Sequence, residues 1–285
     1  MGMLNGKINH SLSDIGFQLF PPSQELSSFV QAYWSIKMKQ DEDKSFMYKI
    51  IADGGSGIAF NLGCDFKVKT VDGCYETIKE YAVTGPTDKT VFMNLSGDIH
   101  AYGIRFLPGG FNVFFPDHIR DANSLMSVFC DHYLERVTLL LNNIQSDISA
   151  QERVKFSDQF LLSLLRERKT EPDMWINDVV RVIQKHHGRL KNDVLAEKFS
   201  LSRRHFERRF KHETGLTVKQ FSKIIRIQKA RSLISLLGGN SLTEVGYECD
   251  YYDQSHFIRE FKSLVRETPK NYQKRKKLMS RLYNS

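Results

Sequence analysis

Two stretches near the C-terminal end of the sequence carry cationic side chains at helical spacing. Arg208 and Lys211 lie in the first stretch, and the second repeats them 51 positions later as Arg259 and Lys262. A guanidinium group can donate two parallel hydrogen bonds to a guanine edge, and an ammonium group binds phosphate as a point charge. The spacing therefore predicts two equivalent nucleic-acid-binding helices.

The two stretches are copies of one unit. The first reads SRRHFERRFKHETGLTVKQF from Ser202, and the second reads DQSHFIREFKSLVRETPKNY from Asp253. Ser and Asp are favoured N-cap residues, so a helix is predicted to begin at each. At 100° per residue, the aromatic residues of each helix lie on one side and the charged residues on the other. The positions that match are His205, Phe206, Arg208, Phe210, Lys211, Thr217 and Lys219, against His256, Phe257, Arg259, Phe261, Lys262, Thr268 and Lys270.

A short apolar segment precedes each copy. KNDVLAEKFSL places Val194, Leu195 and Phe199 around Ala196, and SLTEVGYECDYY surrounds Gly246 with apolar residues. A small residue there lets a first helix cross closely over the second, which is the helix-turn-helix arrangement. The units are joined by a predicted helix that ends at two glycines. Its roughly 20 residues span about 30 Å, close to the roughly 34 Å between successive major-groove faces on one side of DNA.

Over about residues 175–277 these motifs resemble the DNA-binding domain of AraC/XylS-type bacterial transcription regulators. SRRHFERRFKHETG, RIQKAR, YYDQSHFIREFK and TPKNY carry the resemblance. The turn glycine of each unit is replaced by Ser200 and Asp250, Val218 stands where the family has Pro, and Arg266 where it has Gly. The resemblance implies a transcription regulator of double-stranded DNA, favours activation, and implies RNA polymerase as a partner.

Charge divides the chain of 285 residues into two parts. Residues 175–285 hold 24 Lys and Arg against 11 Asp and Glu, a net charge of +13, and the whole chain carries +8, which leaves −5 for residues 1–174. A basic domain attracts nucleic acid. Residues 166–173, RERKTEPD, are the predicted linker, so the predicted domains are residues 1–169 and 170–285.

The first domain is predicted to be β-rich, with accessory helices. A short helix is predicted over SQELSSFVQAYWSI from Ser23, and short β-branched and aromatic segments follow: MYKIIA, GIAFNL, FKVKTV, IKEYAV, TVFMNL and IHAYGIRF. Helices are predicted at residues 123–145 and 151–168. The fold class is therefore α+β with two domains. FVQAYW, ADGGSGIAFNLG, VTGPT and YGIRFLPGGF resemble a cupin-like sensor domain, with Ala52 as a departure, which implies a small-molecule effector.

The predicted site residues divide by role. We predict base contacts from Arg204, Glu207, Arg208, Gln254, Ser255, His256 and Arg259. We predict phosphate contacts from Ser202, Arg203, Arg209, Lys211 and Lys262. Arg105 lies in an apolar strand, where it could point into the β-rich domain and hold a carboxylate of an effector. The alternative is an outward Arg105 with a surface partner.

Other chemistry is not predicted. His100, His118 and His132 stand alone, so no metal or other cofactor is expected. No apolar run is long enough for a membrane span or a signal peptide, which favours a cytoplasmic protein. The cysteines lack CxxC spacing, so we expect reduced thiols there. A redox role for Cys64 and Cys74 is the alternative. Gly54 to Gly57 could cradle a phosphate, but without a following Lys and helix it predicts a hairpin turn.

Three functional classes account for the basic domain to different degrees. A sequence-specific regulator explains the duplicated helices, the charge division and the β-rich half. A DNA-tethered repair-type enzyme needs an activated Cys, for which no activating pattern exists, so the chain is predicted not to be an enzyme. A nonspecific architectural DNA binder explains the charge but not two groove-reading helices on a spacer.

A homodimer is predicted through two helices of the first domain, whose apolar positions exceed what one small sheet must cover. The alternative is that both helices pack on their own domain. The positions are Leu134, Val137, Leu140, Leu141 and Ile144 in one helix, and Val154, Phe160, Leu161, Leu164 and Leu165 in the other.

Overall fold

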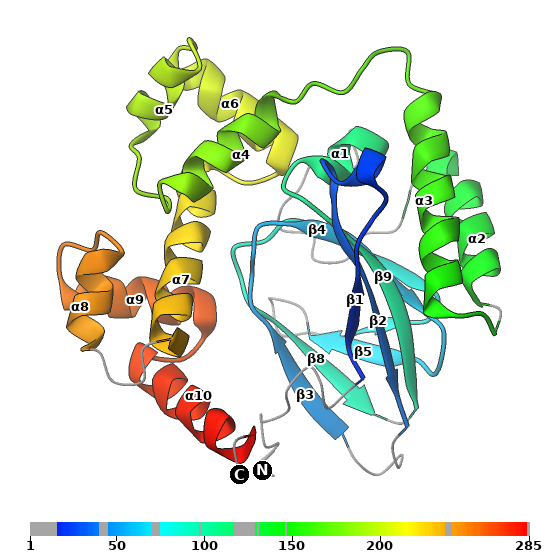
Figure 1. Ribbon diagram of the computed structural model, residues 1–285, viewed down its shortest axis with the longest axis horizontal. Helices are drawn as coiled ribbons and strands as arrows, with labels where there is room; N and C mark the ends of the chain where they lie inside the picture. Colours follow the sequence, from blue (N-terminus) through cyan, green and yellow to red (C-terminus); the bar gives the residue numbers. More distant parts are fainter. Residues whose placement is uncertain are drawn as a thin grey trace.

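Among the residues that the structure describes, short segments rich in β-branched and aromatic residues form strands between Gln18 and Phe106, and helices follow (Figure 1). The predicted α+β architecture, a β-rich part followed by an all-helical part, is confirmed. No helix among the residues described is long and apolar enough to cross a membrane. The structure is a computed structural model that describes residues 16–39, 45–69, 75–96, 98–116, 129, 131–145, 147–236 and 241–283.

Two antiparallel sheets form the β-rich domain. The five-stranded sheet has the order β1-β2-β9-β4-β7, and β9 at its centre pairs Ile104 with both Tyr33 and Ile58. Its strands are β1 (Gln18–Phe20), β2 (Val30–Met38), β4 (Ser56–Asn61), β7 (Tyr81–Thr84) and β9 (Ile99–Phe106). The four-stranded sheet has the order β3-β8-β5-β6, from β3 (Ser45–Ile50), β5 (Phe66–Lys69), β6 (Tyr75–Ile78) and β8 (Val91–Ser96).

The prediction of a helix that begins at Ser23 is wrong. Only the 3-10 turn Gln24–Leu26 forms there, and the next residues make strand β2. Aromatic and β-branched residues fit a pleated sheet well. Tyr33 pairs with Ile104 of β9 on the face that is buried against helices. Long-range pairing with β9 therefore overrides the helical spacing of this segment.

Two further predictions about the strands are corrected. The predicted strand 78–83 is two strands, because β6 ends at Ile78 and β7 begins at Tyr81. The turn at Gly54 is not a hairpin, because β3 and β4, which flank it, belong to different sheets. It is instead the connection between the sheets, and Gly54 has the positive φ of 78° that glycine tolerates.

Helices α2 (Asp131–Gln145) and α3 (Ala150–Arg166) pack against the five-stranded sheet, after the short α1 (Gly110–Phe114). The predicted start at residue 123 lies outside the described residues. All of the predicted apolar positions except Leu134 lie in or pack against the core of their own domain, as the alternative states, and the homodimer stays a prediction. The buried ones are Val137, Leu140, Leu141, Ile144, Leu161 and Leu164.

The helical domain contains both predicted helix-turn-helix units. They are α5 with α6 and α8 with α9, and α7 runs between them (Figure 1). The predicted end of α7 at Gly238 lies outside the described residues. The helices are α4 (Trp175–Lys185), α5 (Asn192–Lys198), α6 (Arg203–Thr214), α7 (Val218–Leu236), α8 (Leu242–Glu248), α9 (Gln254–Val265) and α10 (Pro269–Tyr283).

One hydrophobic core joins the two units to α7. The predicted anchors are fully buried, as is Phe221 of α7, whose ring centroid lies 5.7 Å from that of Phe210. Ala196 and Gly246 occupy the predicted crossing positions in α5 and α8. Val194 does not join this core, because it is 47% exposed. The anchors are Phe206, Phe210, Phe257 and Phe261.

The connection between β3 and β4 docks on α7. Ala52 is buried in the core of the helical domain. Gly54 approaches α7 so closely that a Cβ there would lie 2.8 Å from the Phe221 ring. Ion pairs flank this contact, between Lys223 and Asp88 at 3.0 Å and between Lys49 and Glu267 at 2.9 Å.

Gly246 generates a first prediction. A Cβ there would meet the Phe257 side chain at 3.5 Å, which is an ordinary van der Waals contact, and the equivalent crossing position in the first unit is Ala196. Since Ala also has the higher helix propensity, Gly246→Ala should raise the free energy of unfolding by about 1 kcal/mol. Urea unfolding measures this. An unchanged or lower midpoint would mean that α8 cannot accept the methyl group, and Gly246→Leu is the overpacked control.

Glu267 generates a prediction of pH dependence. Burial raises the pKa of its carboxyl, but bonds from Arg275 and Lys49 outweigh burial and leave it below its usual range. The stabilisation is therefore present above the unfolded pKa and lost as pH falls through the lower folded pKa. Glu267→Gln should cost about 1–3 kcal/mol at neutral pH. In urea unfolding this difference should shrink below about pH 4; a constant difference would contradict the assignment.

Candidate DNA-binding surface

Side-chain caps begin both recognition helices at the predicted residues. The Ser202 hydroxyl accepts a hydrogen bond from the His205 amide at 3.3 Å, and the Asp253 carboxylate accepts one from the His256 amide at 2.7 Å. Each bond satisfies one of the free amides of a helix start. The prediction that α6 and α9 begin at equivalent positions is confirmed.

The turns within the two units adopt a left-handed backbone without glycine. Ser200 has φ of 54° and Asp250 of 65°, so both take the conformation expected of the glycine they replace. Arg266 ends α9 at φ of 61°, where Gly215 ends α6 at 74°. Non-glycine residues carry some strain in this region. The substitutions therefore leave the geometry of both units intact.

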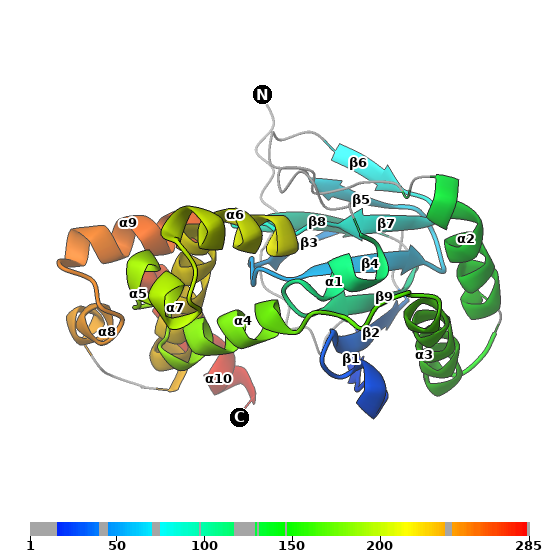
Figure 2. The ribbon, with the colours of Figure 1, turned by 90° about the horizontal axis from the view of Figure 1, so that it is seen from above.

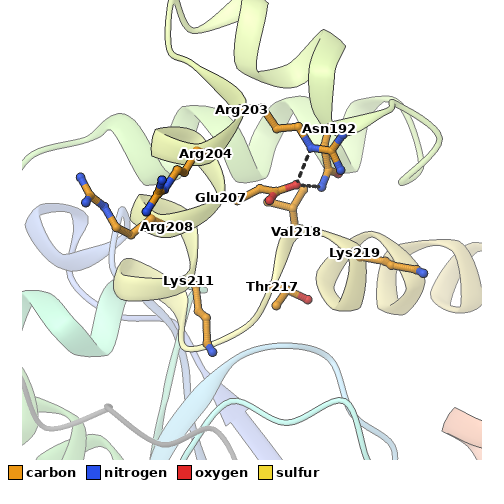
Figure 3. Close-up of a pocket in the computed structure, with 9 residues that line it drawn as sticks. All are labelled: Asn192, Arg203, Arg204, Glu207, Arg208, Lys211, Thr217, Val218 and Lys219. Atoms are coloured by element: carbon orange, nitrogen blue, oxygen red, sulfur yellow. Dashed lines mark hydrogen bonds and ion pairs between the residues drawn. The ribbon is translucent and has the colours of Figure 1, made fainter.

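Burial of the Phe anchors turns the cations of α6 outward. Arg204, Arg208 and Lys211 are exposed and line a groove of about 730 Å³ beside α6. Arg204 and Arg208 point away from Glu207 and its partners (Figure 3). Cations that project from one side of an exposed helix can reach base edges and phosphates.

Glu207 has partners inside the protein. Its Oε1 accepts hydrogen bonds from Asn192 Nδ2 at 2.6 Å and from Arg203 Nε at 3.1 Å (Figure 3). Arg203 also pairs with Asp193 at 3.3 Å. The bond from Asn192, and then that from Arg203, lowers the pKa of the Glu207 carboxyl. Glu207 is therefore ionised at neutral pH and holds Arg203 against the start of α5.

Arg209 does not join the other predicted phosphate contacts on α6. Its guanidinium lies over the Trp175 ring, 4.1 Å from the ring centroid, and forms an ion pair with Asp173. Helical rotation separates it from Arg208 by 100°. The side chain thus connects α6 to α4 rather than to the groove.

The exposed face of α9 repeats that of α6. Gln254, Ser255, Arg259 and Lys262 are exposed. His256 is half-buried, and its ring meets the Tyr251 ring edge to face with centroids 5.2 Å apart. In Figure 2, α6 and α9 lie one after the other along the same edge of the helical domain. The structure thus places two helices with exposed cations along one edge of the helical domain.

Four residues that were not predicted as site residues also line the groove, and Val218 is one of them. Asn192 begins α5, and Thr217 and Lys219 lie at the start of α7. Thr217 and Lys219 recur in the repeat as Thr268 and Lys270, a signal that was visible in the alignment. Asn192 carried no such signal, because its position depends on how α5 packs against α6.

The sensor-domain candidate Arg105 has a partner within its own domain. Its guanidinium forms an ion pair with Asp53, whose Oδ1 also accepts a hydrogen bond from the Gly55 amide at 3.0 Å. The alternative of a surface partner therefore describes it better than a free effector ligand. Within the described residues, no group of three His, Cys, Asp or Glu side chains could hold a metal ion; His118 lies outside those residues.

Comparison with known proteins gives matches to both parts of the chain. Residues 195–275 match a family model described as "Helix-turn-helix domain", and residues 18–125 match "Domain of unknown function (DUF6597)". The chain is 25% identical over 234 residues to the HTH-type transcriptional activator RhaS of Salmonella schwarzengrund, which covers 78% of this chain and 83% of that protein. Over 110 residues it is 32% identical to RhaS of Salmonella arizonae, covering 38% and 39%.

Among solved structures, ToxT from Vibrio cholerae matches with a TM-score of 0.47 at 11% identity, over 85% of this chain and 98% of that one.

The helix-turn-helix match spans α6 to α9 and so includes both recognition helices. The match to residues 18–125 is compatible with a cupin-like first domain. The matched relatives are named transcriptional activators, which agrees with the prediction that the chain is not an enzyme. Residues 195–275, with their duplicated helix-turn-helix unit, thus form a helix-turn-helix domain of the AraC type, and the chain is similar to regulators that carry such a domain.

Proposed function

We propose that the protein is a sequence-specific activator of transcription that inserts α6 and α9 of one chain into two successive major-groove segments. The observation that carries this proposal is the pair of helices with exposed cations, α6 and α9, along one edge of the helical domain. α7, which separates them, has 19 residues and so spans about 28 Å. That length suits the separation of successive major-groove faces. Activation is proposed because the matched relatives are named activators.

Base readout is proposed to centre on Arg208 and Arg259. They occupy the same position in the two copies, opposite the buried Phe anchors, and both are exposed. Glu207 Oε1 accepts hydrogen bonds from Asn192 and Arg203. We propose that Oε2 accepts a hydrogen bond from a cytosine amino group. The further proposed base contacts are Arg204, Gln254, Ser255 and His256.

Phosphate contacts are proposed from four of the residues predicted from the sequence, Ser202, Arg203, Lys211 and Lys262. Lys219 is added to this set, and Arg209 is removed from it. Removal of Arg209 follows from its contacts with Trp175 and Asp173. A nonspecific architectural binder is the second candidate, and DNA competition separates the two. Control by a small-molecule effector in the β-rich domain, a homodimer, contact with RNA polymerase and a cytoplasmic location stay predictions.

The experiment that tests the function is selection of bound sites from random DNA with the purified chain. A regulator should recover one motif with two subsites, and should retain it against excess unrelated DNA. Recovery of no motif, together with equal competition by all sequences, would instead establish the architectural binder. Both measurements need a stated salt concentration, because phosphate contacts make affinity salt-dependent.

Arg208 and Lys211 generate a matched pair of predictions. Arg208→Ala should cost about 1–3 kcal/mol on the selected site and relax base preference at one position, since it removes a bidentate donor. Lys211→Ala should weaken binding to all sequences alike and reduce the salt slope by about one. Fluorescence anisotropy on selected and unrelated duplexes measures both. An equal loss on both duplexes for Arg208→Ala would overturn its assignment as a base reader.

The domain boundary at residue 169 or 170 is also a proposal. α3 ends at Arg166 and α4 begins at Trp175, which supports a linker between them. Residues 170–285 alone should fold and bind DNA more weakly than the whole chain. Removal of the first domain uncovers the α7 surface on which Ala52 packs, so some stability is lost. Circular dichroism and anisotropy check this, and an unfolded fragment would place the boundary elsewhere.

A further inference from the structure

Arg226, near the middle of α7, contacts both the loop that leads into the first helix-turn-helix unit and the second unit itself. Its Nη1 donates a hydrogen bond to the Gly188 carbonyl oxygen at 2.8 Å, in the loop between α4 and α5. Its Nη2 lies 3.3 Å from Oε2 of Glu260 in α9, and the Tyr251 hydroxyl donates to the same oxygen at 2.9 Å. The two charged side chains are 19% and 20% exposed, so the pair is largely removed from water. We name these four residues the inter-unit clasp.

The loop that supplies Gly188 touches the second unit at another point. The Arg189 guanidinium and the Lys229 ammonium both donate to the carbonyl oxygen of Glu248, the last residue of α8. Carbonyl groups at a helix C-terminus are free to accept bonds and carry partial negative charge. The loop that leads into the first unit and α7 are therefore both bonded to the end of α8.

Gly188 brings its loop close enough to α7 for the clasp to form. Its φ is 72°, and a Cβ at this position would lie 2.3 Å from the Ser222 carbonyl oxygen. A residue with a side chain would push the loop away from α7. The carbonyl of Gly188 would then move away from Arg226.

The sequence repeat gives an independent sign that this position has a specific role. Glu260 of α9 occupies the position of Arg209 in α6, 51 residues earlier, and Arg209 likewise contacts the helix before its unit, at Trp175 of α4. In the first unit the contact is a cation over an aromatic ring and connects α6 to α4. In the second unit the helix before the unit is α7, which the first unit shares. Arg226 is long enough to reach both this unit, at Glu260, and the loop before the first unit, at Gly188.

Packing alone leaves the relative position of the units weakly determined. Hydrophobic contact is not directional, whereas hydrogen bonds and ion pairs require particular distances and angles. We propose that the inter-unit clasp fixes the separation and rotation of α9 relative to α6, and thereby makes the protein select DNA by the spacing between its two subsites. This inference rests on the proposed reading of two subsites by one chain. Arg226 acts in it as a positioning residue.

The test measures binding of the full chain to three duplexes. One carries both selected subsites at the selected spacing, one has two base pairs inserted between them, and one keeps a single subsite. Two base pairs rotate one subsite by about 70° relative to the other. The unaltered chain should lose about tenfold or more in affinity on insertion, because both helices can no longer bind together. If the unaltered chain shows no dependence on the second subsite, the proposed two-groove function fails before the clasp is tested.

Arg226→Met and Glu260→Gln each break the clasp while keeping much of the side-chain volume. Each variant should bind the duplex with the selected spacing with about tenfold lower affinity, and the single-subsite duplex with less than about twofold lower affinity. The difference in affinity between the selected and the inserted spacing should therefore shrink. Glu260→Gln makes the chain more positive, so a loss there cannot come from weaker attraction to phosphate. The double variant should lose no more than either single one, because both remove the same interaction.

Arg181→Met is the matched control, since this α4 side chain is 75% exposed and pairs with Asp178 within its own helix. It should keep the spacing preference of the unaltered chain. Equal losses by the clasp variants on single and paired subsites, or an unchanged spacing preference, would overturn the proposal. Should a variant fail to fold, Tyr251→Phe carries the same test with a smaller change, because it removes only the hydroxyl that bonds to Glu260.

Discussion

Burial of two phenylalanines beneath each recognition helix is the constraint on which the DNA-binding surface depends. Burying one such ring contributes about 1.5–3 kcal/mol, while an exposed charge contributes little to folding. Once Phe206 and Phe210 are buried in the core, helical rotation leaves Arg208 facing outward, and Phe257 and Phe261 do the same for α9. The apolar side thus holds each helix in place, and the cationic side is free to bind DNA.

A second constraint is that both units share α7. The core that contains the four phenylalanines also contains Phe221 and Ile224 of α7, so both units pack on the same helix. The β-rich domain contributes Ala52 to this same core. A change in the sheet connection that carries Ala52 therefore reaches the helix on which both recognition helices are mounted, which gives the first domain a physical route to the DNA-binding surface.

Much of the helical domain could be predicted from the sequence because its signals are local. The N-caps, the anchors and the left-handed turns at Ser200 and Asp250 depend on residues within a few positions of one another. Strand β2 was missed because its apolar residues fit helical spacing as well, and only pairing with the distant β9 decides between them. The partners of Arg209 and Arg105 are likewise set by tertiary contacts, with Asp173 and Asp53, which spacing does not reveal.

The central claim is that one chain reads two successive major-groove segments from one side of the DNA. Methylation interference on the selected site tests this most directly, because methylation of guanine N7 blocks contacts in the major groove. We expect interference in two clusters whose centres lie about 10 base pairs apart, one turn of the duplex. Arg208→Ala should remove interference from one cluster, and Arg259→Ala from the other. A single cluster that both substitutions weaken alike would contradict the account.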